Sequence, residues 1–234
     1  MNRCLRNLLW ITLLFLPILA TAATWTVDPD PTAGADFADL QQAIDAANPG
    51  DTLHMAGASE PYSYININKP LSLYGPGYFL LENEAAAGSN ALPARISNLS
   101  ISKGADGTLI SGFVIEQNFA TDPVDSDSIS SVYIRGNQIM GEFECFGIKH
   151  AVVAGNYFPG PIVRFLDCPT VRFSNNIVVS DFEFDAYPDS TSNLEFHHNL
   201  FRGHFSVNDA AIDIEYSIFY DTGFDLSGIN PVTN

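Results

Sequence analysis

The second half of the chain repeats a short pattern of apolar and polar positions. Each copy reads apolar-x-apolar-x-x-Asn-x-apolar, so its side chains alternate between two faces as they do along a β-strand. The sixth position is Asn in four copies and Ser in the fifth, and these residues are 19, 20, 23 and 18 positions apart. A strand-based repeat of about 20 residues predicts a parallel β-helix with one copy per coil. The copies begin at Val132, Ala151, Val171, Leu194 and Ile212.

The Asn positions and the apolar positions of the repeat are predicted to be structural. Asn tolerates the left-handed backbone conformation that a sharp turn needs, and its amide can bond to the coils above and below. The turn residues are Asn137, Asn156, Asn176 and Asn199. The Phe-rich apolar positions are expected to stack in the core, and they are Phe143, Phe165, Phe173, Phe182, Phe184, Phe196, Phe205 and Phe224.

The residues from Asp36 to Ala47 carry a different periodicity. Phe37, Leu40 and Ile44 fall at helical spacing, which predicts an amphipathic helix. Pro49 and Gly50 end that pattern. The first coil of a solenoid has an open apolar end, so this helix is expected to cap it.

The amino-terminal segment and the repeat both resemble a known superfamily. Residues 36–52 read D-F-x-x-L-Q-x-A-I-D-A-A-x-P-G-D-T, which resembles the start of secreted β-helix proteins such as pectinesterases, polysaccharide lyases and periplasmic copper-accessory proteins. The repeat resembles the coils of the pectin-lyase-like superfamily. This resemblance implies an all-β fold: a single right-handed parallel β-helix of eight to ten coils with an amino-terminal capping helix. It leaves the function open, because the repeated residues are those that build coils.

Residues 1–22 have the features of a secretory signal peptide. Arg3 and Arg6 precede an apolar run from Leu8 to Ala20, and Ala22 ends a small-residue cleavage site. The run is shorter than the roughly 20 residues of a membrane span. We therefore expect a secreted, periplasmic or cell-surface protein with no membrane insertion after cleavage, and a β-helix domain over residues 23–234. An uncleaved anchor is the alternative.

Charge and cysteine content narrow the set of partners. The formal net charge is −17, with 27 acidic and 10 basic residues, which argues against nucleic acid and anionic lipid. Neutral sugars and cations fit this surface, whereas an anionic polymer would need local Arg, Lys or Ca²⁺.

In an oxidising compartment, Cys145 and Cys168 either form a disulfide or stay as buried thiols.

Stacking the coils places charged side chains in outward columns. Strands of neighbouring coils lie about 4.8 Å apart, so residues at matching positions become neighbours. This predicts that Arg164 lies between two acidic coils. One column contains Glu142, Ile162, Asp181 and His204, and the next contains Glu144, Arg164, Glu183, Ser206 and Asp225.

Three interpretations of these columns stay open. The first is a surface salt-bridge ladder, in which each exposed pair contributes roughly 0.2–1 kcal/mol. The second is a Ca²⁺ site, because carboxylates are the hard oxygen ligands that this ion prefers. Its ligands would be Glu142, Glu144, Asp181 and Glu183. The third is a catalytic cluster of Arg164, Glu144, Glu183 and Asp181, which resembles polysaccharide lyases in residue types: there, carboxylates and Ca²⁺ neutralise a uronate while Arg or Lys removes a proton.

The outward positions before each Asn form another set of columns. Arg172 and Glu195 are predicted to pair across coils, and so are His197 and Glu215. His197 and His198 are adjacent in a strand and point to opposite sides, so they are not expected to share a metal ion.

Two function classes follow from this pattern. The first is a non-catalytic module that presents a rigid face to a polysaccharide, a cell-surface glycan or another surface. The second is a polysaccharide-modifying enzyme, with a lyase acting on a uronate polymer as its leading form. The short connections after residue 132 favour the module, because enzymes of this fold usually carry long loops that wall a cleft.

Overall fold

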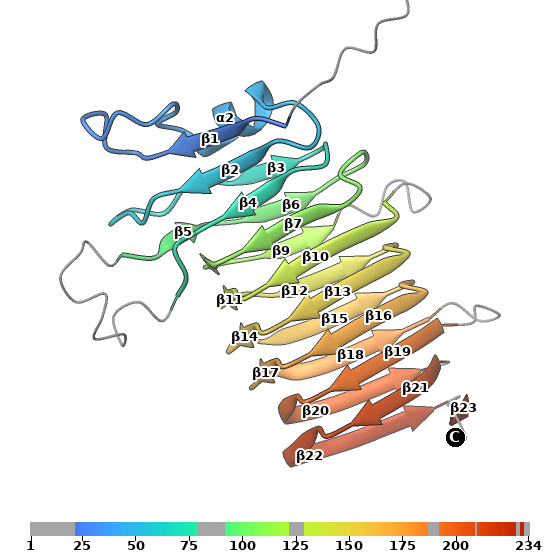
Figure 1. Cartoon of the computed structure of the whole chain (residues 1–234). Helices are drawn as coiled ribbons and strands as arrows, with labels where there is room; N and C mark the ends of the chain where they lie inside the picture. Colours follow the sequence, from blue (N-terminus) through green and yellow to red (C-terminus); the bar gives the residue numbers. More distant parts are fainter. Residues whose placement is uncertain are drawn as a thin grey trace, which may run out of the picture.

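The chain forms an all-parallel β-solenoid of about seven turns (Figure 1). The computed structural model describes residues 22–78, 92–121, 129–186, 192–208, 210–227 and 230–231. The predicted eight to ten coils are too many, because much of residues 28–51 forms turns and a helix instead of a full coil. Residues 1–21 of the predicted signal peptide lie outside the described residues.

One wall of the solenoid, called sheet A here, contains the strands that precede the Asn positions. Its neighbouring strands are parallel, and each comes from the next coil, as Figure 1 shows. In the described part of the chain its order is β1 (Thr24–Val27), β2 (Thr52–Met55), β4 (Ser72–Tyr74), β7 (Thr108–Ser111), β10 (Ser131–Arg135), β13 (His150–Ala154), β16 (Thr170–Ser174), β19 (Ser192–His197), β21 (Ala210–Glu215) and β23 (Asn230–Pro231).

The second sheet makes the other two walls. The wall that follows the Asn positions, face B1, contains β5 (Ala94–Ile96), β8 (Phe113–Ile115), β11 (Gln138–Ile139), β14 (Tyr157–Phe158) and β17 (Ile177–Val178). The last wall, face B2, contains β3 (Ile65–Ile67), β6 (Leu99–Ile101), β9 (Phe119–Thr121), β12 (Phe143–Phe146), β15 (Ile162–Leu166) and β18 (Asp181–Asp185). Strand β20 (Leu200–Asn208) pairs with both walls, and β22 (Ile218–Ser227) pairs with β20.

A ladder of buried amides fixes the corner between sheet A and face B1. The Asn137 Nδ2 donates to the Asn156 Oδ1 at 3.1 Å, and the same bond joins Asn156 to Asn176 at 3.1 Å and Asn176 to Asn199 at 3.2 Å. Each Oδ1 also accepts the backbone N–H of the preceding Asn, as between Asn156 N and Asn176 Oδ1 at 2.9 Å. Ser217 ends the ladder by accepting from Asn199 N at 3.3 Å. The structural role predicted for this column is confirmed.

The left-handed residue of each corner precedes the Asn, so that detail of the prediction is wrong. Its φ is +60° at Gly136, +67° at Gly155, +55° at Asn175 and +57° at His198. The Asn side chain instead points into the corner, where its Nδ2 reaches a backbone carbonyl of the coil before. The preceding residue therefore makes the turn, and the Asn satisfies the buried polar groups that the turn leaves.

The corner between faces B1 and B2 has no space for a side chain at two glycines. A Cβ added to Gly141 would lie 1.0 Å from the Gln117 carbonyl oxygen, and one added to Gly160 would lie 2.1 Å from the Gly141 oxygen. Successive coils thus approach backbone to backbone at this corner. Gly203 continues the column, with its Cβ position 2.5 Å from the Ser180 oxygen.

Phenylalanine rings fill the core between the three walls. Phe173 lies at the centre of the stack, with ring centroids 5.4 Å from Phe182 and 5.9 Å from Phe196. The predicted core positions are buried with one exception: Phe224 is 53% exposed. Phe224 pairs with Phe205 in the column of inward positions, but it belongs to the last described coil, which has no further described coil over it.

Helix α2 (Leu40–Ala46) is shorter than predicted. Asp39 is its N-cap, and the Asp39 Oδ1 accepts from Gln42 N at 2.8 Å. Phe37 lies before the helix in an isolated bridge to Val27, and its ring packs on Trp25. The helix buries Leu40, Ala43 and Ile44 in the common core and packs against β1, β2 and β3 (Figure 1). Within the described residues, no helix is both long and apolar enough to cross a membrane.

Candidate functional site

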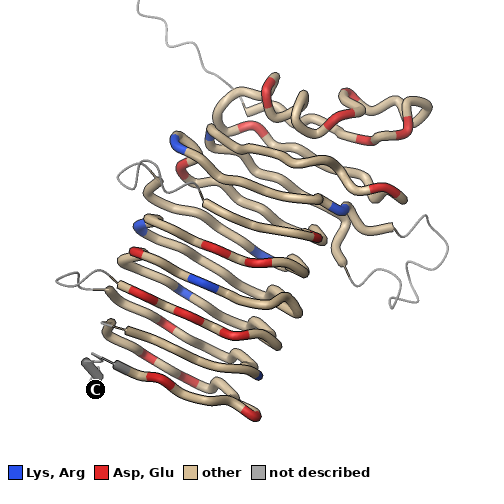
Figure 2. Tube along the Cα trace, turned by 180° about the vertical axis from the view of Figure 1, so that it is seen from behind, with Lys and Arg blue, Asp and Glu red and all other residues tan. Residues whose placement is uncertain are grey.

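The predicted charged column exists on face B2. Glu144 lies opposite Arg164, and Arg164 lies opposite Glu183, on the successive strands β12, β15 and β18. The Arg164 Nη1 is 2.6 Å from the Glu144 Oε1, and its Nε is 2.9 Å from the Glu183 Oε2. The predicted register across three coils is therefore confirmed. Figure 2 shows how acidic and basic positions follow one another on adjacent coils.

The other predicted acidic residues lie beside this ladder. Asp181 is opposite Ile162, as expected, and its Oδ1 accepts from the His204 backbone N at 2.8 Å. Glu142 is exposed just before β12, and its carbonyl accepts from Phe119 N at 2.9 Å. The Asp181 carboxylate thus already serves the next coil, and its catalytic or metal-binding role stays a prediction.

The environment of Arg164 suits a structural ion pair better than a catalytic base. The Glu183 carboxylate, followed by Glu144, raises the pKa of the Arg164 guanidinium above its ordinary value. A general base must give up its proton before it can accept one from a substrate, and its pKa should lie near the working pH. Side-chain exposures of 31% for Arg164, 38% for Glu144 and 41% for Glu183 mark the group as a surface ladder.

The same geometry gives the calcium prediction no support. Arg164 occupies the position between Glu144 and Glu183, so an ion there would have to displace the guanidinium. Among the described residues, no group of three or more His, Cys, Asp or Glu side chains is placed to hold a metal ion.

A cleft of about 720 Å³ lies on the outer face of sheet A. Its floor is recessed at β13, where Val152 stands between Tyr133 and Arg172 in one column. In the next column, Ala154 stands between Arg135 and Ser174. Val and Ala are shorter than Tyr and Arg, so the side chains of β10 and β16 rise on both sides of β13. The lining residues are Ser130, Ser131, Tyr133, Arg135, His150, Ala151, Val152, Thr170, Arg172, Asn193 and Glu195.

Specific contacts orient the polar side chains of this cleft. The Arg135 guanidinium carbon lies 5.6 Å from the centroid of the Tyr133 ring, in a cation–π contact. The Arg172 Nε is 2.9 Å from the Glu195 Oε2, which confirms the predicted pair. The His150 Nδ1 lies 3.2 Å from the Ser130 carbonyl oxygen. A carbonyl can only accept, so the Nδ1 carries the proton and the Nε2 is left for another partner.

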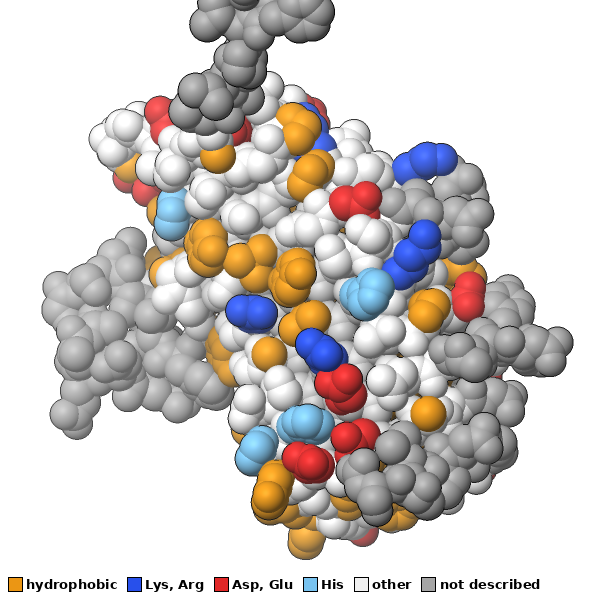
Figure 3. All heavy atoms as spheres, turned by 45° about the vertical axis from the view of Figure 1, so that its right-hand side comes forward, with side chains coloured by type: hydrophobic (Ala, Val, Ile, Leu, Met, Phe, Trp, Pro, Cys, Tyr) orange, Lys and Arg blue, Asp and Glu red, His pale blue; other side chains and the backbone are white. Residues whose placement is uncertain are grey.

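The charge of the cleft is opposite to that of the whole chain. Arg135, Arg172 and His150 line it, and Glu195 is its one carboxylate, although the net charge of the protein is −17. Figure 3 shows basic, acidic and histidine side chains gathered on one face of the molecule. The cleft is thus a locally basic region on an acidic protein.

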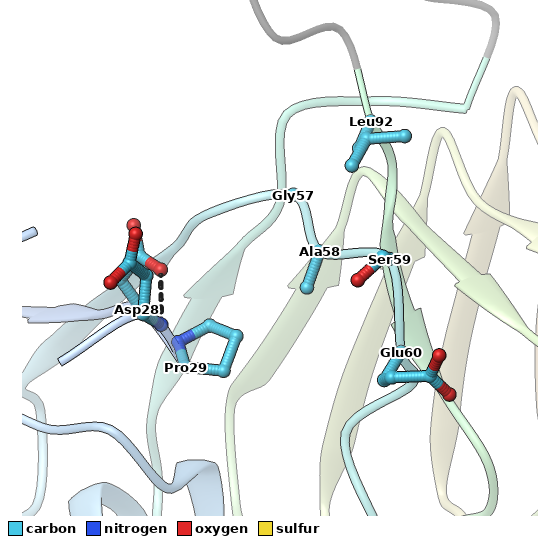
Figure 4. Close-up of a pocket in the computed structure, with 8 residues that line it drawn as sticks. Asp28, Pro29, Gly57, Ala58, Ser59, Glu60 and Leu92 are labelled. Atoms are coloured by element: carbon cyan, nitrogen blue, oxygen red, sulfur yellow. Dashed lines mark hydrogen bonds between the residues drawn. The ribbon is translucent and has the colours of Figure 1, made fainter. Parts of the chain in front are cut away.

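A smaller cleft near the amino end has the opposite chemistry. It measures about 440 Å³, and its lining includes Asp28, Asp30 and Glu60 (Figure 4). The Asp28 Oδ1 accepts from Asp30 N at 2.9 Å, so one of these carboxylates serves a local turn. The walls come from loops, whereas the cleft on sheet A is built on paired strands.

Two other sequence predictions have a structural outcome. His197 lies opposite Glu215 as expected, but the His197 Nε2 is buried without a hydrogen-bond partner in the described structure, so the predicted pair is not formed. Cys145 and Cys168 are buried free thiols, and the Cys168 Sγ lies 3.3 Å from the Cys145 carbonyl oxygen. The side-chain interaction with Cys168, together with burial, raises the pKa of the Cys145 thiol well above its ordinary value.

Sequence reasoning found the side chains of the cleft only in part. Arg172 and Glu195 were recognised as a pair, but Tyr133, Arg135 and His150 were not assigned to a site. The usable signal was the short outward residue Val152 between Tyr133 and Arg172, because a small side chain between two large ones on neighbouring coils makes a recess.

No family model, no curated protein and no solved structure matches this chain. The parallel β-solenoid is therefore established by the strand pairing itself. The resemblance to the pectin-lyase-like superfamily stays a prediction, and so does the right-handed sense of the coils. The charged ladder on face B2 and the cleft on sheet A are consequently the basis for inferring function.

Proposed function

We propose that this protein is a non-catalytic β-solenoid module that binds a glycan on the outer face of sheet A. The observation that carries this proposal is the cleft across β10, β13, β16 and β19. Its volume falls within the range of about 300–1,000 Å³ typical of ligand sites. It offers an aromatic ring at Tyr133 together with the polar side chains of Arg135, Asn193 and Thr170, a mixture that suits a ligand covered with hydroxyl groups.

The rigidity of the wall supports binding of an extended polymer. The strands β10, β13, β16 and β19 pair in continuous parallel register, so the side chains of the cleft project from a fixed backbone. A preorganised surface loses little conformational entropy when a ligand docks. A site that spans four coils can therefore contact several sugar units of a polysaccharide. The protein surface does not have to become ordered first.

The enzymatic alternative has weaker support. The ladder of Glu144, Arg164 and Glu183 lies on face B2, away from the cleft on sheet A. Its arginine forms two ion pairs and keeps its proton firmly. A lyase acting on a uronate polymer would need that group, or another, as a base beside bound substrate.

The proposed setting is the outside of the cell or its surface. It rests on the predicted signal peptide over residues 1–22 and on the acidic composition. In that setting the partner is a polysaccharide or a cell-surface glycan.

The test is a glycan array followed by affinity electrophoresis of the glycans that bind. Tyr133→Ala should weaken binding at least about fivefold, because the ring of Tyr133 forms part of the cleft. Tyr64→Ala is the matched control, since Tyr64 is 56% exposed and lies outside the cleft. Equal losses in both variants, or no bound glycan at all, would overturn the proposal.

A parallel assay addresses catalysis. The protein is incubated with uronate polymers with and without Ca²⁺, and the absorbance of new unsaturated ends is followed. The proposal expects no increase above the buffer control. An increase that Arg164→Ala removes would establish the lyase instead.

A further inference from the structure

The cleft on sheet A has a chemical preference of its own. Resting on the proposed function, we propose that it selects glycans that carry oxyanion groups, as carboxylates or sulfate esters, and that the anion binds between Arg135 and Arg172. The rest of this acidic surface repels such a ligand. The cleft is then the place where a polyanion docks on this protein.

The spacing of the coils leaves room for the anion above β13. Tyr133 and Arg172 belong to one column and are separated by Val152, so their backbones lie two strand spacings apart, roughly 10 Å. In the neighbouring column, Arg135 lies opposite Ala154, whose side chain is also short. Arg135 on β10 and Arg172 on β16 thus lie on opposite sides of β13, whose outward side chains here are short and uncharged.

Arg135 is positioned to recognise an anion directly. Its side chain is exposed and lies against the Tyr133 ring, which orients the planar guanidinium. Among the described residues it has no carboxylate partner. Its fork of N–H donors is therefore left for carboxylate or sulfate oxygens, which it can bind in bidentate geometry.

Arg172 lies on the other side of the cleft from Arg135, on β16. Its Nε is held by Glu195 at 2.9 Å, and the side chain is 64% exposed. A guanidinium has five N–H donors, so one bond to Glu195 fixes its direction and leaves further donors for a ligand. Glu195 then acts as a positioning residue for Arg172.

His150 lines the same cleft as the two arginines and Glu195. Its Nδ1 donates to the Ser130 carbonyl at 3.2 Å, which fixes the direction of the ring. Its Nε2 is left for a ligand in the cleft.

The experiment compares polymers that share one backbone. Dextran, carboxymethyl dextran and dextran sulfate of equal length are titrated into the full protein by calorimetry at low and high salt. At least one anionic polymer should bind ten or more times as tightly as dextran at low salt, about 50 mM, and less tightly at about 500 mM, where exposed charges are screened. The carboxylated and sulfated arms identify which oxyanion is preferred.

Three charge-matched variants place the site. Arg135→Gln and Arg172→Gln should each weaken binding of the anionic polymer at least fivefold. Arg202→Gln removes the same charge from an exposed arginine outside the cleft and should change little. Near-wild-type thermal unfolding in all three variants shows that the effect is local.

The possible outcomes distinguish the anion preference from the proposed glycan-binding function. Equal affinity for dextran and its anionic forms overturns the anion preference alone, and the glycan-binding function stands. Equal losses in Arg135→Gln and Arg202→Gln overturn the assigned position. Failure of every glycan on the array and of all three polymers overturns both proposals.

Discussion

At the scale of single residues, the side-chain amides of Asn137, Asn156 and Asn176 each bond to two other coils. The Asn176 Oδ1 accepts from the backbone and side chain of Asn156, and its Nδ2 donates to the Val153 carbonyl at 2.9 Å and to the Asn199 Oδ1 at 3.2 Å. Because these groups are buried, removal of one amide leaves donors and acceptors without partners.

We expect Asn176→Ala to lower the free energy of unfolding by about 1–3 kcal/mol, the cost of leaving buried polar groups unpaired. Urea denaturation measures the change. Asn193→Ala is the control, because Asn193 is exposed on β19. Similar losses in the two variants would contradict the ladder as a source of stability.

A second residue-scale prediction separates the two kinds of corner glycine. The Cβ of Gly160→Ala would lie 2.1 Å from a backbone oxygen, so coils must move apart, at a cost of about 1–3 kcal/mol. Gly136→Asn should be nearly neutral, because nothing lies within 4 Å and Asn175 already occupies the equivalent left-handed position. Thermal unfolding of both variants checks this, and the reverse order of stabilities would contradict it.

At the scale of elements, the ring stack between the walls is part of the continuous apolar core. Phe173→Ala should cost about 3–5 kcal/mol, since the rings of the neighbouring coils cannot fill the space. Phe224→Ala should cost far less, because that ring is already 53% exposed. Chemical denaturation of the pair checks the inward register, and equal losses would show it to be wrong.

The ladder on face B2 should behave as a surface ion-pair network. Arg164→Gln removes two pairs, each worth roughly 0.2–1 kcal/mol, so we expect a loss of no more than about 2 kcal/mol. The loss should shrink in 1 M NaCl, where the Debye length is about 3 Å. A loss that does not depend on salt would instead indicate a packing role for the aliphatic part of Arg164.

The ladder and the cleft differ in how well the sequence predicts them. The Asn positions give the register after the corner to within one residue, and a one-residue adjustment at residues 159–161 aligns Glu144, Arg164 and Glu183 from the sequence alone. The cleft depends on differences in side-chain size between neighbouring coils, as at Val152 and Arg172, and a repeat pattern treats such outward positions as equivalent. Phe224 was misassigned for a related reason, because the pattern shows which way a side chain points but not whether another coil covers it.

At the scale of the whole molecule, each coil contacts mainly the coils before and after it. The paired strands β10, β13, β16 and β19 come from consecutive copies of the repeat. Stability is then close to a sum of coil energies and nearest-neighbour terms. A local change such as Gly160→Ala should loosen its own coil and the adjacent ones first, which hydrogen exchange can resolve.

The direction of the backbone hydrogen bonds also determines how the protein responds to force. The strands run across the long axis of the solenoid, so the bonds between coils point along that axis (Figure 1). Tension applied to the two ends therefore acts on the hydrogen bonds between one pair of neighbouring coils at a time. The coils separate one after another, and the bonds of many coils do not break together. In optical tweezers we expect low-force steps that each release about 20 residues, or roughly 7 nm of extended chain. The solenoid would then yield coil by coil under tension, and a single cooperative rupture would contradict this consequence of its geometry.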